Sequence, residues 1–200
     1  MSQACCNPTP SRDISYRRVL WIALFANATM FFVELAAAVF SGSSALAADA
    51  ADFLGDSANY ALSLGAIALG GAWVSRVALL KGLAMSVYGV AVLAYAGWRA
   101  WLGVPPEAFT MGVVGLLALL VNVGVAALLY RFRDGDANMK SVWLCTRNDV
   151  IANLAVLIAA AGVFGTGTVW PDVAVAGMLA LLGLSSGRIV IRQARAELGA

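Results

Sequence analysis

Three aspartates lie within one apolar stretch of the chain, ALAADAADFLGDSANY, at residues 45–60. Asp49, Asp52, Asp56 and Asn59 follow one another at steps of three, four and three, which places them on one face of an α-helix. Carboxylates this close together repel one another when all are ionised. A cation, protonation of some of the carboxyl groups, or both must relieve that repulsion. We therefore interpret Asp52 and Asp56 as cation-handling residues, and Asp49 as a gate, a cap or an accessory residue.

A second polar set lies about ninety residues later. Cys145, Asp149 and Asn153 are spaced by four and four, so they also share one helical face. Arg147 lies two residues from both Cys145 and Asp149 and points elsewhere, either to pair with Glu34 or to reach the membrane surface. The sequence has no histidine, which leaves carboxylate, thiolate, amide or backbone groups as metal ligands.

The elements that must position these residues are membrane-spanning helices. The chain has 200 residues, of which 62% are hydrophobic and only 12% are charged, against roughly 25% charged in soluble domains. An all-α membrane protein with six transmembrane helices is therefore expected, because about 20 apolar residues cross a bilayer. The expected spans are residues 19–41, 44–70, 79–99, 109–130, 141–164 and 170–188. Polar breaks separate them, including one that begins at Ser75 and Arg76.

The positions of the basic residues orient these spans. Six spans place both termini on one side, and that side holds eleven of the thirteen Lys and Arg residues. Arg99 alone lies on the other side, and Arg147 lies inside the fifth span. This bias predicts that both termini are cytoplasmic. The expected organisation is a cytoplasmic tail over 1–16, a transmembrane domain over 17–190 and a short cytoplasmic tail over 191–200.

Depth in the membrane brings the two polar sets to one level. With a rise of about 1.5 Å per residue, Asp56 and Asp149 both lie roughly 18 Å below the outer edge of the bilayer. Asp52 and Asp56 from the second span would then face Cys145 and Asp149 from the fifth. These four residues form a predicted divalent metal site with oxygen and sulfur ligands, and Asp49, Asn59 and Asn153 are accessory to it.

These residues resemble the cation diffusion facilitator family, whose members are proton-coupled exporters of divalent metals. The resemblance rests on Asn27 and Glu34, on SSALAADAADFLGD at residues 43–56, and on MKSVWLCTRND at residues 139–149. Similar polar residues also occur in the family where Asn122 and Asp172 stand. The family's fifth span usually carries His-x-x-x-Asp, and here Cys145 replaces that histidine. The match covers about residues 17–190.

The resemblance implies efflux of Zn²⁺ or Cd²⁺ in exchange for protons, with Co²⁺, Pb²⁺ or Hg²⁺ also open as substrates. A thiolate among the ligands favours such softer ions over Mg²⁺ or Ca²⁺. The resemblance also implies a homodimer, here through the transmembrane helices, and a role in metal resistance. We expect a secondary transporter of the bacterial inner membrane, with no permanent cofactor and no nucleic-acid partner. The cytoplasmic C-terminal domain usual in the family is expected to be absent.

Two other functions compete with transport. One is a non-transporting metal-binding subunit or sensor, which would bind metal without moving it. The other is a metal-dependent membrane phosphotransferase, which the Asp-x-x-Asp-x-x-x-Asp spacing faintly resembles, but Phe53 stands where those enzymes have glycine and their arginine is missing. Cys5 and Cys6 are either a capture site for soft metals or two thiols in an untethered tail.

Overall fold

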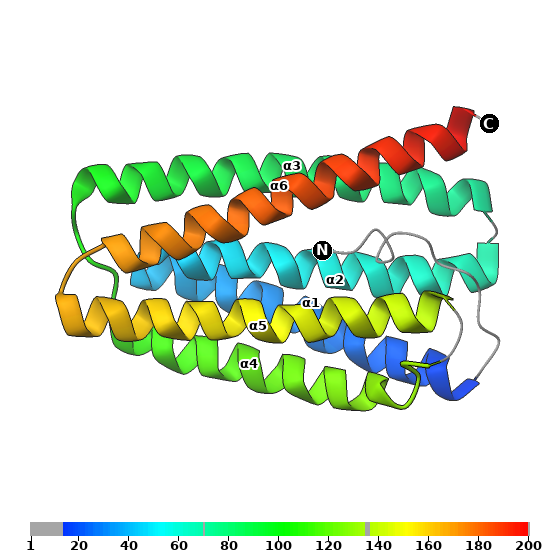
Figure 1. The fold of residues 1–200 in the computed structure, drawn as a ribbon, viewed down its shortest axis with the longest axis horizontal. Helices are drawn as coiled ribbons and strands as arrows, with labels where there is room; N and C mark the ends of the chain where they lie inside the picture. The colour runs from blue at the N-terminus through cyan, green and yellow to red at the C-terminus, as the bar shows by residue number, and fades with distance from the viewer. Residues whose placement is uncertain (1–13, 70, 135–136, 200) are drawn as a thin grey trace.

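A computed structural model describes residues 14–69, 71–134 and 137–199 of the chain. Every element in that part of the chain is a helix, as predicted. The six helices are α1 (Ile14–Ser41), α2 (Ser44–Leu69), α3 (Gly71–Leu102), α4 (Ala108–Tyr130), α5 (Ala137–Thr166) and α6 (Trp170–Gly199). They run lengthwise along one elongated bundle, and α1 begins at the same end at which α6 finishes (Figure 1).

The outside of this bundle is apolar. Phe40, Trp101 and Phe164 are 87%, 88% and 85% exposed, which a water-soluble surface would not favour. In the described part of the chain, five helices are long and apolar enough to cross a membrane: α1, α4 and most of α3, α5 and α6. The protein is therefore an integral membrane protein.

Helix α2 does not meet the same test of length and apolar composition, and it carries Asp49, Asp52 and Asp56. It packs against α1, α3, α5 and α6, so four neighbours surround it. In Figure 1 it runs through the middle of the bundle, with α3 and α6 on one side of it and α5 on the other. A polar helix is placed where other helices, and not lipid, cover its polar groups.

The interior is layered along the bundle axis. One apolar cluster joins Ala37, Ala48, Met111 and Val156 with their neighbours. A second cluster near the other end contains Tyr16, Tyr60, Leu129 and Val142. The buried polar residues of α1, α2, α4 and α5 fall between these clusters in sequence: Asn27, Glu34, Asp49, Asp56, Asn122, Asp149 and Asn153. Apolar packing therefore borders the polar layer at both ends.

A buried carboxylate fixes the start of α2. Asp172, from the first turn of α6, accepts hydrogen bonds from the Ser43 and Ser44 hydroxyls at 2.6 Å each. It also accepts from the backbone N–H groups of Ser44 at 2.8 Å and Ala45 at 3.0 Å. The first N–H groups of a helix have no partner inside the helix, so a carboxylate aimed at them is strongly stabilising. This contact fixes the height of α2, and hence of its aspartates, in the bundle.

The turn between α1 and α2 requires a glycine. Gly42 has φ +71°, and a Cβ atom built on it would lie 2.6 Å from Arg99 Nη2. The Arg99 guanidinium is held there by donating to the Val104 carbonyl at 2.9 Å. The connection between α3 and α4 is tied to the same turn, because the Glu107 N–H donates to the Ser41 carbonyl at 2.9 Å. Hydrogen bonds from Thr110 and Phe109 lower the pKa of Glu107, which caps α4 as an exposed carboxylate.

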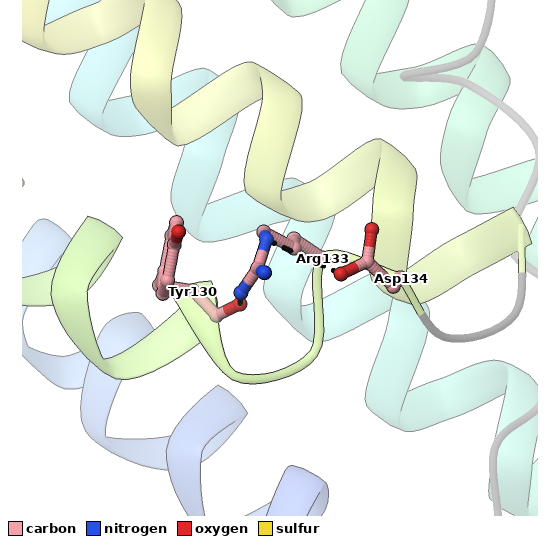
Figure 2. Close-up of polar contacts among 3 residues, drawn as sticks. All are labelled: Tyr130, Arg133 and Asp134. Atoms are coloured by element: carbon pink, nitrogen blue, oxygen red, sulfur yellow. Dashed lines mark hydrogen bonds and ion pairs between the residues drawn. The ribbon is translucent and has the colours of Figure 1, made fainter.

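Arg133 stabilises the chain as it leaves α4. Its guanidinium lies 3.8 Å from the centre of the Tyr130 ring and donates to the Tyr130 carbonyl at 3.1 Å. The same group pairs with Asp134 at 3.2 Å (Figure 2). These three contacts hold the Arg133 side chain against the C-terminal end of α4.

Some helix ends lie beyond the predicted spans. The predicted break at Ser75 and Arg76 is wrong, because α3 begins at Gly71 and includes both residues. Helix α6 continues to Gly199, eleven residues past the predicted end of the last span. Hydropathy marks where a helix enters water, but a helix does not have to end there.

Asp172→Ala is expected to lower the free energy of unfolding by roughly 2–4 kcal/mol, because four buried donors lose their acceptor. Thermal unfolding in detergent micelles would measure this loss. Glu107→Ala is the matched control, since it removes an exposed cap and should change the melting temperature much less. A melting temperature equally affected by both substitutions would contradict the role given to Asp172.

Candidate metal site

The polar face of α2 points toward α5. Asp49 is fully buried, Asp56 is 6% exposed and Asp52 is half-buried. On α5, Cys145 and Asp149 are 7% and 8% exposed. The i, i+3 and i, i+4 spacings seen in the sequence produce these two facing rows.

The four predicted metal ligands line one cavity. Its volume is about 40 Å³, and Asp52, Asp56, Cys145 and Asp149 all lie on its wall. Asn59, predicted as accessory, lines it as well. The remaining wall residues are Gly55, Lys81, Met85, Ser186 and Val190. The cavity therefore collects side chains from α2, α3, α5 and α6.

Asp56 and Asp149 are the closest carboxyl groups across the two helices. The Asp149 carboxyl lies within hydrogen-bonding reach of Asp56. The Tyr60 hydroxyl donates to Asp56 at 3.0 Å and lies 2.7 Å from the Thr146 hydroxyl, which orients one side of the pair. Asp149 Oδ2 has no hydrogen-bond partner among the described residues. The pair therefore retains oxygen acceptors for an incoming cation.

The ligand groups line the cavity without converging on one point. Among the described residues, no three Cys, Asp or Glu side chains are arranged closely enough to hold one ion. Cys145 takes part in a disulfide in the structure, so its sulfur is not a thiolate there. Binding a metal through all four groups would thus require reduction of Cys145 and an inward movement of side chains.

Two of the predicted accessory residues lie outside the cavity wall. Asn153 Nδ2 donates to both carboxylate oxygens of Asp49 at 2.8 Å. Asn153 Oδ1 accepts from Asn122 Nδ2 at 2.8 Å. Asp49 and Asn153 therefore satisfy each other, one helical turn from Asp52 and Asp149 respectively.

Lys81 is a cavity residue that the sequence reasoning missed. In the sequence, Lys81 is one of the eleven basic residues expected on the cytoplasmic side. In the structure, its ammonium donates to Asn59 Oδ1 and its charge acts on Asp56. Met85 and Ser186 were missed too, because neither carries a signal of its own in the sequence. Only the packing of α3 against α6 brings them to the site.

The other polar residues singled out from the sequence have local roles. Arg147 is exposed, lies 5.5 Å from the Trp143 ring centre and donates to Asn148 at 3.5 Å. The predicted alternative that Arg147 pairs with Glu34 is therefore wrong, since Glu34 is fully buried and neither of its oxygens accepts from a described donor. Asn27 Nδ2 donates to the Ala23 carbonyl of its own helix at 2.8 Å. Cys5 and Cys6 lie outside the described residues.

The chain is similar to known proteins of cation efflux. The model of the cation efflux transmembrane domain matches residues 20–198. The metal cation efflux system protein CzcD of Cupriavidus metallidurans is 29% identical over 178 residues, which are 82% of this chain and 56% of that protein. A cadmium, cobalt and zinc/H⁺–K⁺ antiporter of Bacillus velezensis is 25% identical over 189 residues, or 86% of this chain and 60% of that protein.

The chain thus spans a little more than half the length of these curated relatives. The family match covers nearly all of α1 to α6, including every residue of the cavity wall. From this match and the apolar helices around the cavity, the chain belongs to the cation efflux family.

Proposed function

We propose that this protein exports divalent heavy-metal cations of the Zn²⁺ and Cd²⁺ class from the cytoplasm by exchange for protons. The ion is held near the middle of the membrane by Asp52, Asp56, Cys145 and Asp149. The single observation that carries the proposal is the cavity whose wall contains all four residues. The relatives named as efflux systems and antiporters support transport over simple binding.

The chemistry of the ligands supports the coupling to protons. Carboxylates and thiolates bind a metal only when deprotonated, so metal and proton compete for the same groups. On the cytoplasmic side the metal binds and protons leave. On the outer side protons displace the metal, and their return drives the next cycle. Three carboxylates and one thiolate carry enough negative charge for a divalent ion and suit the softer metals.

The proposed topology has six membrane spans. Helix α2 crosses with the five apolar helices, although its own composition is too polar to signal a span. The distribution of basic residues and the positive-inside rule favour cytoplasmic termini. The proposed membrane is the inner membrane of a bacterium. The transport unit is residues 17–190, flanked by cytoplasmic residues 1–16 and 191–200, and pairs with a second copy through its transmembrane helices.

A non-transporting metal-binding subunit or sensor would be built from the same cavity. It differs in one measurable property, since metal would bind without crossing the membrane. A phosphotransferase would need basic groups to hold phosphate. Among the described residues, Lys81 is the one basic side chain on the cavity wall, so the cavity favours a metal site over a phosphate site.

Asp56→Asn is expected to abolish zinc flux driven by a pH gradient in proteoliposomes, because the substitution keeps the shape of the side chain but removes its charge. Asp134→Asn, which neutralises an exposed carboxylate (82% exposed) on the α4–α5 connection, is the matched control and should leave flux unchanged. Undiminished flux in Asp56→Asn would remove Asp56 from the site. Zinc binding without flux in the native protein would favour the sensor.

Cys145→Ser is expected to weaken Cd²⁺ binding at least about tenfold more than Zn²⁺ binding, because the softer ion loses more when sulfur is replaced by oxygen. Isothermal titration of the reduced protein with each metal would give the two dissociation constants. Equal losses for both metals would mean that the thiol does not set selectivity.

Lys81→Met is expected to tighten zinc binding by about tenfold, because a fixed ammonium in the cavity opposes a divalent ion. Arg76→Met makes the same change of charge on an exposed side chain of α3, away from the cavity wall. Zinc titrations of both variants separate a local effect from one of general surface charge. Equal tightening in both, or weakened binding in Lys81→Met, would contradict a direct opposition between Lys81 and the metal.

A further inference from the structure

A second pair of buried carboxyl groups lies outside the cavity wall. Asp49 of α2 and Glu34 of α1 are both fully buried, and they lie within hydrogen-bonding reach of each other. Neither lines the cavity that holds Asp52 and Asp56. The proposed metal site therefore does not use this pair.

The two carboxyl groups are not equivalent. Asp49 receives the Asn153 amide on both oxygens at 2.8 Å, and Asn122 orients that amide by donating to it at 2.8 Å. An acid flanked by N–H donors is held as a carboxylate. Neither oxygen of Glu34 accepts a hydrogen bond from a donor among the described residues, although the side chain has no exposure. A buried polar group with no partner is costly, so the pair needs a further hydrogen atom or cation to be satisfied.

Among the described residues, the neighbouring helices supply no positive charge to the pair. The titratable groups that act on it are Asp52 from α2, Tyr88 from α3 and Asp149 from α5, and α4 contributes the neutral Asn122. None of these is a cation. Two adjacent carboxylates in a membrane interior must share a positive charge. A metal ion would need a cavity, and neither residue lines the one described above, whereas a proton needs no such space. With a proton between the two groups, Glu34 would donate a hydrogen bond to Asp49.

We propose that Glu34 and Asp49 form a proton-binding site separate from the metal cavity, and that its proton is exchanged for metal in addition to the protons that the metal displaces from its own ligands. This inference rests on the proposed function. Asp49 lies one helical turn from Asp52, so a divalent ion arriving at Asp52 repels the shared proton. The proton then leaves Glu34 for water on the cytoplasmic side, and both groups remain as carboxylates. A proton taken up from the outside restores the pair and favours release of the metal.

Glu34→Gln tests this directly. The glutamine amide donates to Asp49 permanently, so it copies the shape of the protonated pair but cannot release a proton. Zinc flux into proteoliposomes would be measured with a zinc gradient alone and with an added pH gradient, while an enclosed pH dye reports proton movement. We expect zinc binding to persist, the number of protons moved per zinc ion to fall, and the pH gradient to drive less zinc flux than in the native protein. Glu107→Gln, at an exposed carboxylate outside the pair, should remain coupled.

Asp49→Asn provides a second variant and should be uncoupled in the same way, so a folding defect in one variant does not decide the outcome. Full coupling in a folded Glu34→Gln protein would overturn the proposal. Loss of zinc binding in Glu34→Gln, as severe as in Asp56→Asn, would overturn it too, by assigning Glu34 to the metal site. The same experiment distinguishes failure of this proposal from failure of the proposed function. If the proposed function fails, the native protein itself shows no zinc flux driven by a pH gradient.

Discussion

The structure depends on burying the carboxylates of one helix, α2, inside the bundle of a membrane protein. Charged side chains at this depth are costly unless other helices enclose them and a cation or hydrogen-bond donor compensates them. Helix α2 meets the first condition, since α1, α3, α5 and α6 surround it. Asp172 meets a related need at its N-terminus, where the carboxylate accepts from two backbone N–H groups and two serine hydroxyls. One contact between α2 and α6 thus sets the height of every acidic residue on α2.

The same helix presents two kinds of acidic site at successive turns. Asp49 accepts from the Asn153 amide and lies outside the cavity wall, whereas Asp52 and Asp56 border the cavity. A site outside the cavity suits a proton, and the cavity suits a metal that must exchange ligands. Because both sites lie on one helix, the charge of an ion at one site can change the affinity of the other site for its ion.

Much of this arrangement could be predicted from the sequence. The steps between Asp49, Asp52, Asp56 and Asn59 predict one helical face, and depth alone brings Asp149 to the level of Asp56. The bonding of Asn153 to Asp49 could not be predicted, because spacing shows that two side chains share a face but not which neighbour satisfies them. Lys81 and Ser186 reach the cavity only through the packing of α3 and α6, which no local pattern encodes. The cap formed by Asp172 was missed for the same reason, since 128 residues separate it from Ser44.

The central claim is that one metal ion binds to the carboxylates of α2 and α5 together with the sulfur of Cys145. X-ray absorption of the reduced, zinc-loaded protein tests it most directly, with Cys5 and Cys6 both replaced by serine so that Cys145 is the one sulfur of a cysteine left. The account predicts one sulfur at about 2.3 Å and oxygen ligands at about 2.0–2.2 Å, in fourfold coordination. A shell of oxygen atoms alone, unchanged by Asp149→Asn, would contradict it.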